Sequence, residues 1–173
     1  MSAHLVTKKD KILLLPVKPV VQVNGYECGV ACVQTILGTR GLKSNRLSLK
    51  KSLHTTKSYG TLSHRIKNLF KLHGLKAKEK FGANLGDIEA ELSKGRLCLV
   101  AYQAWGEKKY YKKLQSGHYS VVFGIEADYL WLADPFVKGE RVRYRAGVRK
   151  IKRNIFEGRW VDEDGLDHWY LAV

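Results

Sequence analysis

The chain has 173 residues, of which 45% are hydrophobic, and it carries a formal net charge of +15. This length and composition fit a single domain spanning residues 1–173 and exclude a disordered chain. No apolar run approaches the roughly 18 residues that a membrane-spanning helix needs, and no Gly-x4-Gly-Lys-Ser/Thr loop is present, so we expect neither a membrane anchor nor an ATPase site in this sequence.

The N-terminal region is predicted to be extended and to lack a secretory signal. Residues 11–21 form an extended segment that Pro16 and Pro19 interrupt. The region has only a short apolar run at residues 12–15, without the long apolar stretch and small-residue cleavage site of a signal peptide. The three cysteines of the chain cannot all pair, and their positions indicate reduced thiols. We therefore expect a cytoplasmic protein.

A helix is predicted to begin at Cys28. Apolar residues recur after it at helical spacing, and Gly38 marks the end of the pattern. A thiol on the first turn of a helix lies at the positive end of the helix dipole, which stabilises a thiolate. Gln22, six residues earlier, is placed to fold back over the same sulfur. Its amide N–H would then stabilise an oxygen that becomes negative during acyl transfer.

Three further helices are predicted before residue 95. A Lys-rich stretch at residues 44–53 has the pattern of a short helix capped by Ser44. The apolar spacing over residues 62–73 predicts an amphipathic helix that ends at Gly74. A shorter helix is predicted over residues 86–94, where acidic side chains near the N-terminus favour the helix dipole.

From residue 97 onward the pattern changes to strands. Runs of apolar and β-branched residues predict strands at residues 97–104, 118–125, 129–133, 141–145 and 168–173. The polar segment over residues 105–117 is predicted to be a loop that borders a cleft. Helices followed by strands indicate an α+β fold.

His118 and Asp134 are predicted to meet at one end of a hairpin. His118 opens an apolar strand, and Asp134 follows the next strand and precedes Pro135. A hairpin that turns near Glu126 places His118 beside Asp134 or one residue from it. Facing residues of an antiparallel pair have Cβ atoms about 4.5–5.5 Å apart, so this carboxylate is able to orient the imidazole ring. Alternatively, Asp134 caps a turn before Pro135.

These residues resemble a known family, the bacteriocin-processing cysteine peptidases. The resemblance lies in the Gln-x5-Cys-Gly-x-Ala-Cys segment that starts at Gln22, the Gly-His-Tyr-Ser-Val-Val strand around His118, and the Asp-Pro pair at Asp134. Members of this family are papain-like domains that remove double-glycine leader peptides, usually at the N-terminus of an ABC exporter. The resemblance implies a papain-like α+β fold with the active site in a cleft between a helical lobe and a sheet lobe. Because the sequence ends at Val173 without exporter regions, we expect a free-standing domain.

The resemblance also assigns roles to four residues. Cys28 is the expected nucleophile, His118 the base, Asp134 the residue that orients His118, and Gln22 the oxyanion donor. This chemistry requires no metal ion and no organic cofactor. The expected substrate is a peptide or protein, cleaved after small residues such as Gly-Gly.

Other interpretations of the same residues remain open. Cys32 and Cys98 are predicted to be buried core residues. A zinc site formed by Cys28, Cys32 and His118 lacks a fourth ligand. The fold is also compatible with a peptide-binding module that does not cleave, or with a basic adaptor for nucleic acid or a membrane surface.

The positive charge is concentrated in the half of the chain that contains Cys28. Residues 1–80 hold 16 Lys or Arg and 3 Asp or Glu, whereas residues 81–173 hold 15 and 13. Such a field attracts an acidic protein, an anionic surface or nucleic acid without sequence specificity. A solvated basic face is the commoner origin of such charge, and no zinc-finger or ribonucleoprotein motif accompanies it. A nucleic-acid partner is therefore only weakly supported.

Overall fold

A seven-stranded antiparallel sheet forms the centre of the molecule in the computed structural model, which describes residues 12–137, 146–163 and 165–173. The strands are β1 (Leu13–Leu14), β2 (Lys78–Lys80), β3 (Cys98–Gln103), β4 (Gly117–Ile125), β5 (Tyr129–Ala133), β6 (Val148–Lys152) and β7 (Tyr170–Ala172). Their order in the sheet is β2-β7-β3-β4-β5-β6, and β1 pairs with β4. This arrangement confirms the predicted α+β, papain-like fold.

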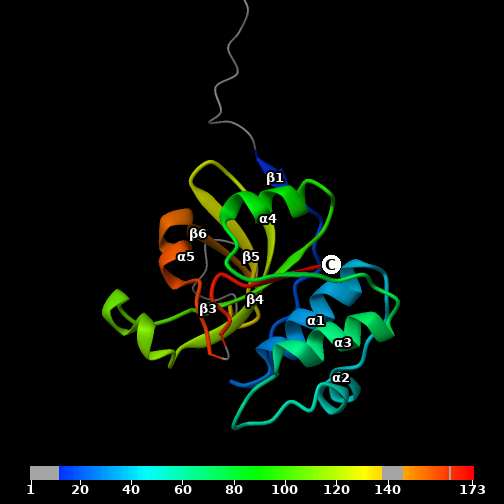
Figure 1. Cartoon of the computed structure of the whole chain (residues 1–173). Helices are drawn as coiled ribbons and strands as arrows, with labels where there is room; N and C mark the ends of the chain where they lie inside the picture. Colours follow the sequence, from blue (N-terminus) through cyan, green and yellow to red (C-terminus); the bar gives the residue numbers. More distant parts are fainter. Residues whose placement is uncertain (1–11, 138–145, 164) are drawn as a thin grey trace, which may run out of the picture.

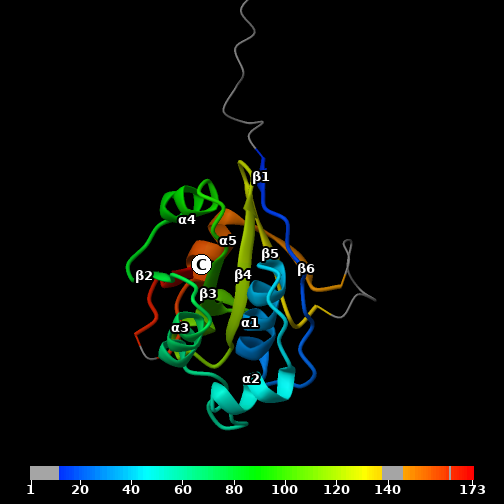
Figure 2. The same ribbon diagram turned by 90° about the vertical axis from the view of Figure 1, so that its right-hand side faces the viewer.

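Helices lie on both sides of this sheet (Figures 1 and 2). Their bounds are α1 (Cys28–Thr39), α2 (Arg46–Ser52), α3 (Ser63–Leu72), α4 (Leu85–Leu92) and α5 (Arg153–Arg159), with a 3-10 helix η2 (Lys108–Lys113) between β3 and β4. In the described part of the chain, no helix has the length and apolar character needed to cross a membrane.

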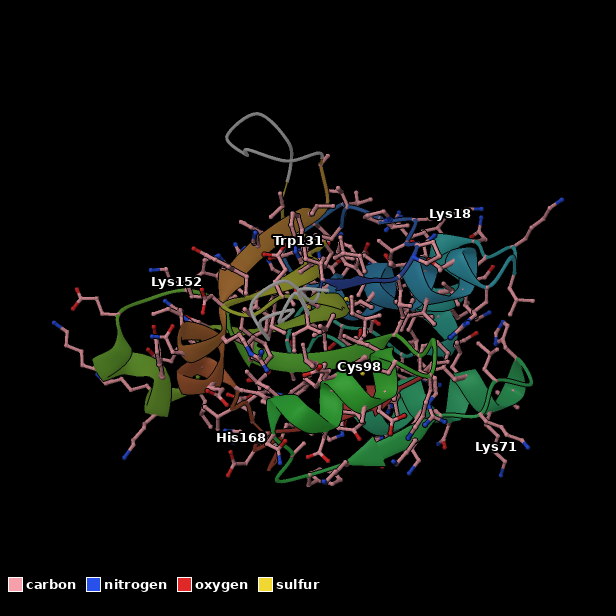
Figure 3. The ribbon with its side chains drawn as sticks, turned by 90° about the horizontal axis from the view of Figure 1, so that it is seen from above. Lys18, Lys71, Cys98, Trp131, Lys152 and His168 are labelled. Atoms are coloured by element: carbon pink, nitrogen blue, oxygen red, sulfur yellow. The ribbon has the colours of Figure 1, made fainter. Side chains whose placement is uncertain are left out.

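The core consists of two clusters, one on each face of the sheet. Along β3, Leu99 and Ala101 pack with residues of α1, α2 and α3, whereas Val100 and Tyr102 pack with residues of α4 and α5. Alternate residues of a strand point to opposite faces, so a strand covered on both faces is apolar throughout. This explains the continuous apolar runs of β3 and β4. Cys98 lies in the interior, as predicted, whereas Lys18, Lys71 and Lys152 lie at the periphery (Figure 3).

The starts of two helices differ from the prediction. The cap of α2 is Asn45 and not Ser44, because the Asn45 backbone is extended and its side-chain oxygen accepts the N–H of Ser48 at 3.1 Å. The helix predicted from residue 86 begins at Leu85. Asn84 caps it in a reciprocal arrangement with Asp87, in which each side chain accepts the backbone N–H of the other residue.

Three short elements were not predicted. β2 has the sequence Lys-Glu-Lys and is held only by pairing with β7. β6 carries three basic residues, so its sequence did not indicate a strand that pairs with β5. α5 has only seven residues and follows β6 directly. The strand predicted at residues 141–145 falls outside the described residues. In the segment predicted to be a polar loop, η2 occupies the middle.

Candidate active site

The predicted nucleophile and the predicted base line one cavity of about 420 Å³. The walls of the cavity come from four parts of the chain: the start of α1, the loop between α2 and α3, the residues up to and within the beginning of β4, and the segment after α5. Leu114 and Gln115 belong to the segment that was predicted to border a cleft, and both line the cavity. The cavity therefore lies where the helical layer meets the sheet.

Cys28 is the first residue of α1, and its side chain is partly exposed. The residue before it, Glu27, is buried, and its carboxylate contacts Arg46 at 2.5 Å and Lys50 at 2.9 Å. Burial favours the neutral carboxyl group, but hydrogen bonds from Lys50 and Arg46 outweigh it and lower the pKa of Glu27. The start of α1 is thus tied to α2 by the buried, ionised carboxylate of the residue that precedes Cys28. No local sequence pattern around Glu27 predicts this anchor.

The backbone at the start of α1 also depends on a close approach to another loop. A Cβ atom at Gly29 would lie 2.7 Å from the Cβ of Thr61, so only glycine fits at this point. Thr61 lines the cavity, and its hydroxyl is hydrogen-bonded to that of Thr55 at 2.7 Å. Gly29 therefore allows one wall of the cavity to pack directly against the helix that carries Cys28.

His118 is almost fully buried in β4 and is hydrogen-bonded to Asp134. The distance from His118 Nε2 to Asp134 Oδ1 is 2.8 Å. Burial opposes protonation of the imidazole, but interactions with Asp134 and Cys28 outweigh it and raise the pKa of His118 to about 9. Because Nε2 is bonded to Asp134, the other ring nitrogen, Nδ1, is the atom available to the thiol of Cys28. The structure thus brings together three of the four predicted side chains.

Asp134 is fully buried and uses both carboxylate oxygens. Besides His118, Oδ1 accepts the backbone N–H of Phe136 at 3.0 Å, and Oδ2 lies 3.0 Å from Nε of Arg149. Burial alone would raise the pKa of Asp134, but the bond from His118 and the positive charges of His118 and Arg149 outweigh it and lower the pKa. Asp134 is therefore ionised and fixed in orientation.

Tyr102 and Arg149 complete this network, and neither was predicted from the sequence. The Tyr102 hydroxyl donates to Asp134 Oδ2 at 3.4 Å and accepts from Nη1 of Arg149 at 3.2 Å. Burial raises the pKa of Tyr102, so this hydroxyl stays protonated and remains a donor. Tyr102 faces His118 across the β3–β4 pair, and Arg149 lies in β6 opposite Leu132. Neither position is signalled by a local motif.

The predicted hairpin of β4 and β5 is present, with a small change of register. Ala133 faces Val121, and Trp131 faces Gly124, because a bulge shifts the pairing between Val122 and Gly124. In this register His118 and Asp134 are diagonal neighbours across the pair and do not face each other directly. Their side chains nevertheless meet, since both lie at the same end of the hairpin.

Gln22 is buried and attached to the Asp134 segment through its backbone. Its N–H donates to the carbonyl oxygen of Pro135 at 2.8 Å, and its side-chain Nε2 donates to the carbonyl oxygen of Asn24 at 2.7 Å. Among the described residues, its side chain has no hydrogen bond to Cys28, His118 or Asp134. The amide retains a second N–H, which is the donor that an oxyanion role requires.

Two aromatic rings cover His118. The Trp105 ring centroid lies 5.0 Å from that of His118, and the Phe136 centroid lies 6.4 Å from it. Trp105 and Phe136 also contact each other, with centroids 5.0 Å apart. These partly exposed rings limit the access of water to the His118–Asp134 hydrogen bond, which strengthens it. Trp105 falls in the segment predicted to be a polar loop.

The alternative zinc site finds no support in the geometry. Within the described ranges, no group of three His, Cys, Asp or Glu side chains is arranged to hold a metal ion. Cys32 is buried in the core beneath Cys28, and burial raises the pKa of its thiol well above the usual value. Cys32 is thus an inert core residue, as predicted.

Comparison with known proteins gives a match to one family and to several solved structures. The sequence profile of the Peptidase C39 family matches residues 16–163. Comparison with the sequences of curated proteins gives no significant match. Among solved structures, the chain is similar to a C39-like peptidase from Bacillus anthracis, with a TM-score of 0.73, 14% identity, and 94% of this chain and 97% of that chain covered.

Two further solved structures are similar. One is a double-glycine motif protease from an AMS/PCAT transporter in complex with the leader peptide, with a TM-score of 0.62, 16% identity and 91% of each chain covered. The other is the peptidase domain of Streptococcus ComA, a bi-functional ABC transporter involved in quorum sensing, with a TM-score of 0.66, 19% identity, and 89% of this chain and 95% of that chain covered. At these identities, the shared feature is the fold.

Proposed function

The chain belongs to the Peptidase C39 family, and we propose that it is a cysteine peptidase in which Cys28 attacks the scissile carbonyl carbon of a peptide or protein. The observation that carries this proposal is that Cys28 and His118 line one cavity, while His118 is held by the buried carboxylate of Asp134. A nucleophile, a base and a group that orients the base are the parts that acyl transfer requires.

The reaction begins from a thiolate–imidazolium pair. The pKa of His118 is about 9, so the imidazole is protonated at neutral pH and stabilises a thiolate at Cys28. The thiolate attacks the carbonyl carbon, and His118 then donates its proton to the leaving amine. Water, activated by the neutral imidazole, releases the acyl group from the sulfur. Asp134 keeps the ring in one orientation and does not itself take the proton.

The negative oxygen of the tetrahedral intermediate needs hydrogen-bond donors. We assign this role to the backbone N–H of Cys28, which has no acceptor within α1 because it is the first helical residue, and to the second N–H of the Gln22 side chain. A well-aimed donor of this kind is worth about 3–4 kcal/mol of transition-state stabilisation.

We further propose that the residues before the scissile bond are small, as in a Gly-Gly pair. The support is the family match and the similarity to a double-glycine motif protease.

Cleavage of a peptide library by the purified protein tests the proposal. Products are identified by mass spectrometry, and the library includes Gly-Gly peptides. We expect cleavage at a consistent site by the wild-type protein and none by Cys28→Ala. If Cys28→Ala cleaves as fast as the wild type, the nucleophile is misassigned. If the pure protein binds peptides tightly but cleaves none, the chain is a binding module and not a peptidase.

A further inference from the structure

Asp162 lines the same cavity as Cys28 and His118, and the proposed mechanism gives it no role. It lies in the segment between α5 and β7 and is partly buried. A Cβ atom at Gly117 would lie 2.3 Å from Oδ1 of Asp162 and 2.7 Å from Oδ2. The carboxylate therefore rests against the backbone of β4, one residue before His118.

The position of this carboxylate is fixed through one of its two oxygens. Oδ1 accepts Nε2 of Gln103 at 3.0 Å and the backbone N–H of Glu163 at 2.9 Å. Gln103 is itself buried, and its orientation is set because its Oε1 accepts the backbone N–H of Ser116 at 2.9 Å. Oδ2 has no hydrogen-bond partner among the described residues. Asp162 thus presents one unused carboxylate oxygen at a fixed place in the cavity.

Among the described residues, Asp162 differs from the fully buried carboxylates because no basic side chain forms an ion pair with it. Glu27, Glu91 and Asp134 each contact the basic side chains of at least two residues. Asp162 has no ion pair within the described residues, although the chain carries a net charge of +15. Burial raises the pKa of Asp162 to about 6, and the positive charge of His118, which is already paired with Asp134, only partly offsets this effect, so Asp162 is mostly ionised at neutral pH. A partly buried carboxylate without an ion pair of its own is costly unless a ligand supplies a cation.

We propose that Asp162 binds a cationic group of the substrate, an ammonium or a guanidinium, located within a few residues of the scissile bond. This inference rests on the proposed peptidase function, because it assigns the cavity to the substrate. The cation has two possible sources in a peptide, a Lys or Arg side chain and a free N-terminal amine. Both would donate to Oδ2, while Gln103 and the Glu163 N–H continue to hold Oδ1.

The test measures peptide binding to protein that carries Cys28→Ala, so that no cleavage occurs. Fluorescently labelled peptides carry either Lys or norleucine at one of the three positions before a Gly-Gly pair, and a second set compares free with acetylated N-termini. We expect at least one ammonium-bearing peptide to bind about tenfold more tightly than its neutral counterpart, as a charged hydrogen bond of this strength predicts. The set in which the difference appears identifies the source of the cation.

Two substitutions that each remove one negative charge then test whether Asp162 is responsible for the preference. Asp162→Asn keeps an acceptor for Gln103 and is expected to reduce the tenfold preference to about one. Asp128→Asn removes the same charge at the exposed turn between β4 and β5 and is expected to retain the preference. A preference that survives Asp162→Asn, or no preference in the parent, would overturn the inference.

The experiments distinguish a failure of the cation-site proposal from a failure of the peptidase proposal. If the wild type cleaves no peptide but Asp162-dependent binding is seen, the peptidase proposal fails and the cation site stands. If the wild type cleaves peptides without any Asp162-dependent preference, the cation site fails and the peptidase proposal stands.

Discussion

At the scale of single residues, the charge of His118 couples the proposed site to the stability of the protein. The pKa of His118 is about 9 in the folded chain, against about 6.5 for an ordinary histidine. The folded state therefore binds this proton more tightly than the unfolded state does. Its contribution to stability is fully present below pH about 6.5 and is lost as the pH rises through about 9.

This coupling predicts how stability depends on pH. We expect the free energy of unfolding of the wild type to exceed that of His118→Gln by more at pH 6 than at pH 10. The difference should shrink by up to about 3 kcal/mol, since each pKa unit corresponds to about 1.4 kcal/mol. Urea unfolding of both proteins at pH 6, 8 and 10 measures it. A difference that is constant or increases with pH would show that His118 is not stabilised as the imidazolium.

Arg149 offers a second prediction at this scale, because it fixes the oxygen of Asp134 that His118 does not use. Arg149→Met removes a charged hydrogen bond worth about 1.5–3 kcal/mol, and we expect kcat/KM to fall about tenfold. The loss of a nearby positive charge should also raise the pKa of His118 and move the alkaline limb of the pH–rate profile upward.

Arg149→Lys serves as the matched variant. It keeps the charge near Asp134 but not the geometry of the guanidinium, so we expect the pH profile to stay in place while activity is reduced. An unchanged pH profile in Arg149→Met, together with reduced stability, would show that Arg149 supports the fold and does not tune the site.

The site residues that could be predicted are those whose positions follow from local sequence patterns. Cys28 opens a helical repeat, and His118 and Asp134 lie at the ends of two strands joined by a short turn. Tyr102 and Arg149 reach Asp134 through the pairing of β3 with β4 and of β5 with β6. Such long-range register does not follow from residue spacing. For the same reason, the sequence does not predict that Asp162 lacks an ion pair with the described residues.

At the scale of secondary structure, the position of α1 decides where Cys28 lies. Gly29→Ala would ordinarily favour a helix, but here the added Cβ would lie 2.7 Å from Cβ of Thr61. We expect a loss of stability of about 1–3 kcal/mol from overpacking and a displaced cavity wall. Gly38→Ala is the control, because nothing lies within 4 Å of its added Cβ in the same helix.

Thermal unfolding and the rate of Cys28 alkylation measure both effects. Gly29→Ala should lower the melting temperature and the alkylation rate, whereas Gly38→Ala should leave the rate unchanged and keep or slightly raise the melting temperature. Equal behaviour of the two variants would mean that the Thr61 contact does not position α1.

The elements predicted well are long and periodic, and those missed are short. α1, α3, β4 and β5 carry clear apolar patterns and appear where expected. β2, β6 and α5 have between three and seven residues and several basic side chains, so their identity depends on what they pair with. The cap at Asn45 shows the same limit, because Ser44 and Asn45 are both good caps and only the backbone conformation selects between them.

At the scale of the whole molecule, Arg40 joins the helical layer to the sheet. It follows α1, and its Nη2 donates to the carbonyl oxygens of Gly95 at 2.9 Å and Val173 at 2.8 Å. We expect Arg40→Ala to lower the free energy of unfolding by about 1 kcal/mol, because these bonds are partly exposed to water. Lys71→Ala is the control, since Lys71 lies exposed at the periphery (Figure 3) and, with the described residues, makes no ion pair.

Urea unfolding is the measurement for this pair of variants. A loss in Arg40→Ala no larger than in Lys71→Ala would show that the contacts of Arg40 with Gly95 and Val173 add nothing to stability. The Cys28 alkylation rate should change little in either variant, because both positions lie outside the cavity that holds the thiol.

The central claim is that Cys28 is a nucleophile activated by His118, and its alkylation rate at pH 6 tests this most directly. Iodoacetamide reacts with thiolates, and modification of Cys28 is located by mass spectrometry after digestion, with buried Cys32 and Cys98 as internal references. We predict that Cys28 of the wild type is alkylated about 100-fold faster than Cys28 of His118→Ala. Equal rates in the two proteins would contradict the account.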